Sequence, residues 1–146
     1  MSLEEFDICI LNYQSNNIKN IVNNLNKKIK SDDNTTGTFL PKQLDKDNFI
    51  VMLKDKISYE ISSFIWYAFY PNDIFIKILH VNFSYTFNKF RFKGLNKSLT
   101  LELEKIGRNN KIQYITLTPF ENSPIKKILI KLGYTSQINY FYKKIF

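Results

Sequence analysis

The sequence predicts a mixed α/β fold in which helices pack on one mixed sheet. The chain has 146 residues, the usual length of one domain, and 44% of them are hydrophobic, enough to form one core. Helical and strand-like spacings of apolar residues alternate along the chain, and no repeat or linker divides it. We therefore expect one domain over residues 1–146, with the order β-α-(loop)-β-β-β-α-β-α-β.

The N-terminal third predicts a strand, a helix and a loop. Residues 6–11 have the pattern of a short, mostly buried strand, in which Cys9 is a small apolar residue. Ser15 is placed to cap a helix whose apolar residues recur every three or four positions, on one face. Residues 31–48 are polar and predict a loop. The apolar positions of the helix are Ile18, Ile21, Val22, Leu25 and Ile29.

Residues 49–86 predict three antiparallel strands because β-branched and aromatic side chains dominate them. We expect the strands at 49–54, 57–69 and 74–86. Asp55 and Lys56 predict a tight turn between the first two strands. Pro71, Asn72 and Asp73 predict the turn that follows.

The C-terminal part predicts two helices and two strands. Residues 112–118 are almost free of charge, which favours a central strand, and residues 138–145 predict the last one. Ser123 and Pro124 predict the start of the second helix, and Gly133 predicts its end. The first of these helices begins near Gly94, with Leu95, Leu99, Leu103 and Ile106 as its buried stripe.

Composition excludes several classes of protein. A single cysteine, Cys9, excludes a disulfide within the chain, and a single histidine, His80, excludes a two-histidine zinc motif, so we expect no metal. The N-terminus is acidic where a signal peptide is basic. The most apolar stretch, residues 61–83, is interrupted by polar residues and is too short on either side to span a membrane. We therefore expect a soluble, cytoplasmic protein.

Positive charge is concentrated in the second half of the chain. Residues 71–146 hold 13 Lys or Arg and 4 Asp or Glu, whereas residues 1–70 hold 8 Lys and 9 Asp or Glu. Such a basic half suits nucleic acid, a membrane surface or a phosphate-rich cofactor. A solvated basic surface without a specific partner is the alternative reading of the same pattern.

A phosphate site is predicted where a strand meets a helix, at Arg91, Lys93 and Gly94. A glycine at such a junction lets the backbone come close to a ligand. The first N–H groups of the helix have no partner within it, and they lie at the positive end of its dipole. Lys97 adds charge one turn further on. An ordinary loop with solvated basic residues is the alternative.

Residues 91–96 resemble the Arg/Gln-x-x-Gly-x-Gly/Ala pyrophosphate loop of the GNAT superfamily, the acetyl-CoA-dependent N-acyltransferases. Phe90 stands where an aromatic residue commonly precedes that loop. Asn122, Lys131 and Gly133 with the following tyrosine fit a second segment of the family, and the order of elements agrees with a GNAT-like fold. The resemblance implies that acetyl-CoA is bound by Thr86, Phe87, Arg91, Phe92, Lys93, Gly94, Leu95, Asn96, Lys97 and Asn122.

The sequence departs from the family pattern at three positions. Asn96 replaces the second small residue of the loop, and Ile125 replaces an alanine. Leu129 stands where many members have a tyrosine that protonates the departing thiolate. This last departure supports a second hypothesis, a domain that binds CoA without catalysis.

The resemblance implies transfer of an acetyl group directly to a primary amine. Negative charge develops on the thioester oxygen, and backbone N–H groups of a bulged fourth strand, near Thr86 and Phe87, are expected to stabilise it. The amine must lose a proton, so a base is needed, and His80 and Glu60 are the candidates. Each has a structural alternative, a histidine hydrogen-bonded within the sheet and a hairpin charge pair. Tyr142, like Tyr134 and Tyr140, is a candidate for the missing acid, or a packing residue.

The expected acceptor is a small-molecule or peptide amine. A basic nucleic-acid-binding module is a further hypothesis, because Phe87, Phe90 and Phe92 alternate with Lys89, Arg91 and Lys93. It lacks the aromatic strand motif and the glycine clamp of common RNA-binding modules, so nucleic acid is the weaker reading. The aromatic run 64–67 suits pairing of strands in a homodimer.

Overall fold

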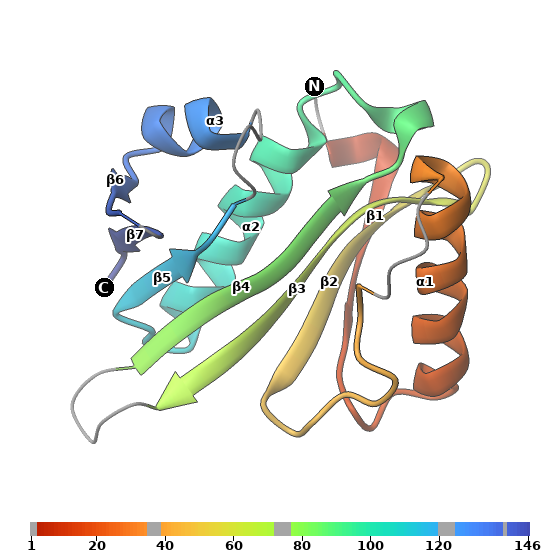
Figure 1. Cartoon of the computed structure of the whole chain (residues 1–146), viewed down its shortest axis with the longest axis horizontal. Coiled ribbons are helices and arrows are strands. Elements are labelled where there is room, and N and C mark those ends of the chain that lie inside the picture. The colour runs from red at the N-terminus through yellow and green to blue at the C-terminus, as the bar shows by residue number, and fades with distance from the viewer. Residues whose placement is uncertain (1–2, 35–38, 72–76, 120–124, 139) are drawn as a thin grey trace.

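In the part of the chain that the structure describes, seven strands form one sheet in the order β1-β2-β3-β4-β5-β7-β6, with helices on both faces (Figure 1). The computed structural model describes residues 3–34, 39–71, 77–119, 125–138 and 140–146. All neighbouring strands are antiparallel except β4 and β5, which are parallel. Helix α1 lies on one face of the sheet and α2 on the other. The predicted mixed α/β fold is confirmed.

The elements follow the predicted order, with one short strand added near the C-terminus. The strands are β1 (Phe6–Leu11), β2 (Asn48–Asp55), β3 (Ile61–Pro71), β4 (Lys77–Thr86), β5 (Tyr114–Leu117), β6 (Thr135–Ser136) and β7 (Phe141–Lys144). The helices are α1 (Ile18–Asp33), α2 (Leu95–Asn109) and α3 (Ile125–Lys131), with single 3-10 turns at η1 (Leu3–Glu5) and η2 (Asn88–Phe90). No described helix is long and apolar enough to cross a membrane.

Helix α1 begins later than the sequence predicts. Ser15 does not cap it: the Ser15 hydroxyl accepts a hydrogen bond from the Asn12 N–H at 3.0 Å, within the preceding turn. The helix starts after Asn17, whose φ of 58° places it in the left-handed region and whose side chain makes no capping bond. The far end runs on to Asp33, so the first residues of the predicted loop are helical.

Asn26 holds the chain after α1 against the helix. It is a buried amide on a helix that is otherwise apolar on this face. Its Oδ1 accepts from the Phe39 N–H at 3.1 Å and the Leu40 N–H at 2.9 Å, and its Nδ2 donates to the Leu40 carbonyl at 3.1 Å. A buried amide with all three bonds made fixes the geometry without an unsatisfied polar group.

The turn between β2 and β3 is wider than the predicted tight turn. The Asp55 side chain accepts from the N–H groups of Ile57 and Ser58, both at 2.9 Å, as aspartate does when it organises a turn. Tyr59 adopts a φ of 60°, and β3 begins only at Ile61. Ile57 is therefore exposed in the turn instead of extending the strand.

Strand β1 is an edge strand, and the prediction that it is mostly buried is wrong. Phe6 is buried, but Ile8 and Ile10 are 40% and 52% exposed. The strand pairs only with β2. The predicted pairing of strands between two molecules through residues 64–67 is wrong. These residues lie in β3, an internal strand that already pairs with β2 on one side and β4 on the other.

The C-terminal predictions hold in outline. The predicted strand at 138–145 is the shorter β7, and β6 pairs with it. Strand β5 is central, between β4 and β7, as predicted. Gly133, with a φ of 90°, follows α3. The turn at Asn72 and Asp73 and the predicted helix start at Ser123 and Pro124 lie outside the described residues.

A buried carboxylate ties α2 to the C-terminal strands. Glu104 is 1% exposed. It accepts a hydrogen bond from the Lys143 ammonium at 2.9 Å, and from Arg108 and the Tyr134 hydroxyl at 3.3 Å each. Lys143 also donates to the Leu132 carbonyl at 2.6 Å. The pair thus joins α2, the end of α3 and β7.

We expect Glu104→Ala to lower the free energy of unfolding by about 3 kcal/mol, because the Lys143 ammonium loses its counter-charge in a largely buried place. Urea denaturation measures this. The control is Glu102→Ala on the same helix, expected to change stability by less than about 0.5 kcal/mol. The double variant Glu104→Leu, Lys143→Met should cost less than Glu104→Ala alone, and equal or larger losses would contradict the role of the pair.

Candidate functional site

A cavity of about 560 Å³ opens where β4 and β5 part. Among the described residues, the two strands pair only between 78–81 and 114–117. Beyond Val81 they diverge, and the gap is closed by the start of α2 and by α3. The wall consists of residues 81–86 of β4, residues 90–92 and 94–96, residues 117–119, and Ile125 and Ile128 of α3.

A bulge in β4 lies where the strands part. Phe83 is opposite Trp66 and Val81 is opposite Tyr67, so Asn82 is one extra residue on β4. Such a residue is left out of the ladder, and the bulged strand bends. Asn82 lines the cavity. The sequence contains no signal for this position, and we expected the bulge near Thr86 and Phe87.

Thr86 and Phe87, the residues expected at the bulge, differ in their position relative to the cavity. Thr86 lines the cavity, and its hydroxyl shares a hydrogen bond with the Ser63 hydroxyl at 3.0 Å. Phe87 is buried and does not line the cavity. Its N–H donates to the Ser62 carbonyl at 3.0 Å, so it is not available to a ligand.

The loop before α2 brings a helix N-terminus to the cavity. Gly94, with a φ of 72°, precedes the first residue of α2, and no side chain caps the helix. A Cβ on Gly94 would meet nothing within 4 Å, so space is open beside the backbone. Gly94, Leu95 and Asn96 all line the cavity. Its wall therefore includes N–H groups suited to an anion.

Asn96 leaves a polar atom without a partner in this wall. Its Oδ1 is buried and accepts no hydrogen bond from any residue that the structure describes. Buried acceptors are rarely left unpaired in proteins. A ligand that donates a hydrogen bond here would satisfy it.

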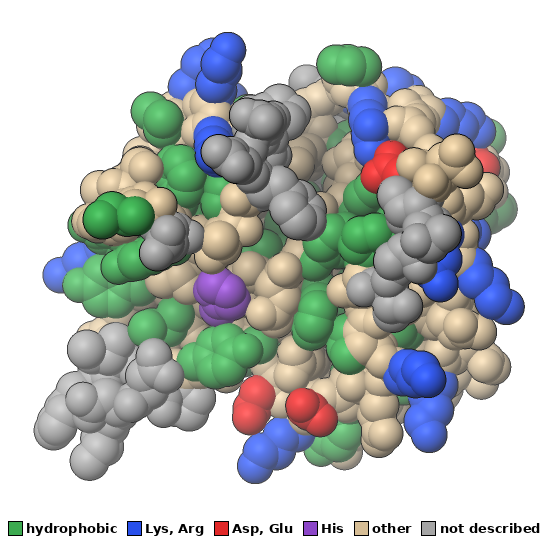
Figure 2. Space-filling model, in the orientation of Figure 1, with side chains coloured by type: hydrophobic (Ala, Val, Ile, Leu, Met, Phe, Trp, Pro, Cys, Tyr) green, Lys and Arg blue, Asp and Glu red, His purple; other side chains and the backbone are tan. Residues whose placement is uncertain are grey.

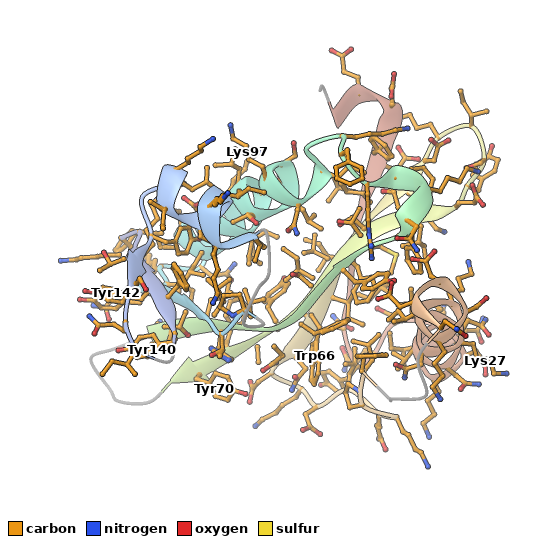
Figure 3. The ribbon with its side chains drawn as sticks, turned by 45° about the horizontal axis from the view of Figure 1, so that its top comes forward. Lys27, Trp66, Tyr70, Lys97, Tyr140 and Tyr142 are labelled. Carbon is orange, nitrogen blue, oxygen red and sulfur yellow. The ribbon has the colours of Figure 1, made fainter. Side chains whose placement is uncertain are left out.

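The cations of the loop are held in different ways. Arg91 Nε donates to the Thr86 carbonyl at 2.9 Å, and its guanidinium lies 3.3 Å from Asp33 and 5.5 Å from the Tyr85 ring centroid. Arg91 thus connects the end of β4 to the end of α1. The Lys93 and Lys97 side chains are exposed, and Lys97 projects from α2 (Figure 3).

Two carboxylates at the C-terminus of α1 hold the loop in place. Asp32 accepts from the Tyr85 hydroxyl at 2.7 Å and from the Asn88 N–H at 3.0 Å. Burial, and then the bond to Asp32, raise the pKa of Tyr85, so its hydroxyl stays a donor. Acidic groups at a helix C-terminus are disfavoured by the dipole, and here these bonds offset that cost.

We expect Asp32→Ala to lower the free energy of unfolding by about 2 kcal/mol, because the largely buried Tyr85 hydroxyl and the Asn88 N–H lose their acceptor. Urea denaturation at pH 7 measures it. Asp33→Ala is the matched control: it removes a partly exposed ion pair with Arg91, leaves Asp32 as the acceptor for Tyr85 and Asn88, and should cost less than about 1 kcal/mol. Equal losses would show that Asp32 has no special role.

No protein-family model matches the sequence, and no curated protein matches it. Solved structures match over nearly the whole chain. An aminoglycoside acetyltransferase from an uncultured soil metagenomic sample has a TM-score of 0.70 at 12% identity, over 94% of this chain and 95% of its own. The E. coli protein YhhK, solved bound to coenzyme A, has a TM-score of 0.59 at 14% identity, over 95% and 98%. A GNAT-family acetyltransferase from Listeria monocytogenes has a TM-score of 0.63 at 11% identity, over 95% and 94%.

The chain has the GNAT fold. At these identities the likeness is one of architecture, and it confirms the predicted element order across the chain. In this GNAT fold the cavity lies between the two parting strands, and the predicted loop residues 91, 92 and 94–96 line it. Lys93 lies in the same loop but outside the lining, and Asn122 lies outside the described residues.

His80 and Tyr142 are brought into one row on the face of the GNAT sheet that carries α1. His80 of β4 is opposite Thr116 of β5, which is opposite Tyr142 of β7. Residues opposite each other in a sheet share a face. His80 Nδ1 lies 2.7 Å from the Thr116 hydroxyl, and the ring packs at 6.2 Å from Tyr70. Figure 2 shows the histidine at the surface among hydrophobic side chains, and Figure 3 shows Tyr70, Tyr140 and Tyr142 toward the same end of the sheet.

Burial lowers the pKa of His80 below its ordinary 6.5, so the ring is neutral at pH 7. The unfolded chain then binds more protons than the folded chain just below pH 6.5. Stability is therefore lost as the pH falls through that range.

We expect His80→Asn to remove this pH dependence, since an amide can keep the bond to Thr116 and does not titrate. Urea denaturation of both proteins between pH 8 and pH 5 measures it. The wild-type protein should lose stability relative to the variant as the pH falls below 6.5. Parallel pH profiles would contradict the lowered pKa of His80.

Glu60 lies neither in the row of His80, Thr116 and Tyr142 nor in the lining of the cavity. It lies in the turn before β3 and accepts from the Lys89 ammonium at 2.6 Å. That bond, and a second one with Ser58, lower the pKa of Glu60 and make it a weaker base. Both partners are exposed, so the surface charge pair considered in the sequence is what the structure contains.

The tyrosines considered as proton donors also have partners. Leu129, which stands at the position of the missing acid, is fully buried and outside the cavity. The Tyr134 hydroxyl is hydrogen-bonded to Glu104, and the Tyr140 ring centroid lies 6.1 Å from that of Tyr142.

The aromatic residues considered for stacking on nucleic-acid bases are Phe87, Phe90 and Phe92. Phe87 and Phe90 are buried, so of these three only Phe92 is accessible.

Proposed function

We propose that the protein is an N-acetyltransferase that transfers an acetyl group from acetyl-CoA directly to a primary amine. The observation that carries the proposal is the cavity between the parted strands, which ends at the uncapped N-terminus of α2. The unpartnered Asn96 Oδ1 in its wall supports a ligand with N–H donors. The structural neighbour from E. coli binds coenzyme A, which adds support for this ligand.

The loop residues suit the anionic part of that ligand. The diphosphate would lie at the N–H groups that follow Gly94, with charge from Lys93 and Lys97. Arg91 acts as a positioning residue, because Thr86 and Asp33 already bind its guanidinium. The amide-containing arm would enter the cavity, where Asn96 Oδ1 accepts a hydrogen bond.

Acetyl-CoA, when bound, supplies an activated thioester. The Asn82 N–H, at the bulge that lines the cavity, is our proposed donor to the oxygen on which negative charge develops. His80 is the proposed base: in the tautomer in which Nδ1–H donates to the Thr116 hydroxyl, Nε2 accepts the proton of the amine. Tyr142, across Thr116 from His80, is the proposed proton donor in place of Leu129.

The acceptor is proposed to be a small-molecule or peptide amine. One structural neighbour is an aminoglycoside acetyltransferase, which makes an amino sugar a suitable first compound to assay. Tyr70, Thr116 and Tyr142 provide polar hydroxyl groups around His80. A homodimer and a cytoplasmic location stay predictions of the sequence.

Isothermal titration with acetyl-CoA, comparing Gly94→Ala with Gly133→Ala, tests the binding step. Both glycines have positive φ, so alanine strains each backbone by a similar amount, about 1 kcal/mol. Only Gly94 lies at the cavity. We expect Gly94→Ala to weaken binding about tenfold, a free-energy change of about 1.4 kcal/mol, and Gly133→Ala to leave it unchanged.

No binding of millimolar acetyl-CoA by the folded wild-type protein would overturn the proposed function. Equal weakening by both substitutions would remove the loop from the ligand site. Where binding holds, release of free thiol with a panel of amines tests turnover. Binding without turnover would favour the alternative suggested by Leu129, a domain that binds CoA without catalysis.

A further inference from the structure

Phe92 is an aromatic residue that the fold does not use. Its side chain is fully exposed, at 103% of the reference area. Its φ is 65°, in the left-handed region, which is costly for a bulky side chain. The backbone therefore holds an apolar ring in solvent in an unfavourable conformation, and no gain in packing offsets this. Strained residues of this kind gather at ligand sites.

The neighbouring Phe90 shows the contrast within the same loop. Phe90 is buried, packs edge-on to Phe6 at 6.3 Å, and has the ammonium groups of Lys89 and Lys93 each 5.6 Å from its ring centroid. Phe90 thus builds the loop. Phe92 lies two residues further on, beside the cavity, and its ring faces solvent.

The position of Phe92 suits one part of a CoA molecule, and here the argument rests on the proposed function. CoA is linear: the pantetheine arm and the adenosine leave opposite ends of the diphosphate. With the arm in the cavity and the diphosphate at the start of α2, the adenosine must lie outside, on the solvent side of the loop. Phe92 lies on that side, between the basic residues Arg91 and Lys93.

We propose that Phe92 stacks on the adenine base of CoA and makes the site specific for acyl carriers that contain adenosine. Every base has an apolar π face, and aromatic side chains bind it by stacking. Lys93 of the loop and Lys97 of α2 are exposed cations, so the phosphate on the ribose, like the diphosphate, has positive charge within this segment. An acyl phosphopantetheine lacks both base and ribose and gains nothing from Phe92.

Isothermal titration with two ligands tests the proposal: CoA, and 4′-phosphopantetheine, which lacks the adenosine, its ribose phosphate and one phosphate of the diphosphate. We expect Phe92→Ala to weaken CoA binding about tenfold, the size expected for one stacked base, and to change phosphopantetheine binding less than twofold. Phe92→Trp should keep the affinity for CoA. Ile57→Ala is the matched control, because Ile57 is also highly exposed, at 91%, and lies outside the cavity.

The outcomes separate this proposal from the proposed function. Wild-type binding of CoA that Phe92→Ala leaves unchanged would overturn the stacking alone. Equal weakening of both ligands would overturn it too, because the loop and not the base would then be affected. No binding of either ligand by the wild-type protein would overturn the proposed function itself. Thermal unfolding of each variant, expected unchanged for a fully exposed ring, checks that the fold is retained.

Discussion

Within the described ranges only four residues of β4 pair with β5, and the cavity exists because the two strands part after Val81. The extra residue Asn82 bends β4 at that point. Parting leaves an opening inside the sheet, lined by residues 81–86 of β4 and by residues 117–119. Everything else in the candidate site follows from this opening: α2 closes one end, α3 closes one side, and His80 lies just before the bulge on the paired part of the strand.

Two carboxylates on helices keep the walls of this opening in position. Asp32 ties α1 to the end of β4 through the Tyr85 hydroxyl. Glu104 ties α2 to β7 through Lys143. Each lies on the helix of a different face, so the two sides of the cavity are braced independently. The cost of burying Glu104 is offset by its hydrogen bonds with Lys143, Arg108 and the Tyr134 hydroxyl.

Much of this architecture could be predicted from spacing alone. The stripe on α2, the charge-free central β5 and the glycine before α2 are local patterns, and each indicated its element. Edges and bulges depend on what lies beside a strand, which the sequence does not state. Ile8 looked buried because its neighbours alternate, yet β1 turned out to be an edge strand. Asn82 resembles any polar strand residue. Asp55 organises its turn through side-chain hydrogen bonds, and the turn contains no glycine that would indicate its type. His80 could be picked out, but its partner Thr116 is 36 residues away in the chain.

The long connection between β4 and β5 also bears on the order of folding. Strands β1 to β4 are joined by antiparallel neighbours, and the hairpin β2–β3 needs only a short turn. Strand β5 reaches β4 only after α2 has crossed the sheet, which brings Ile78 beside Tyr114 from across the intervening chain. Contacts between distant residues form late, because the entropy of closing the loop is lost before the contact is gained. The opening between β4 and β5 thus takes shape after the β2–β3 hairpin, and a nascent chain completes its wall only when synthesis has passed α3.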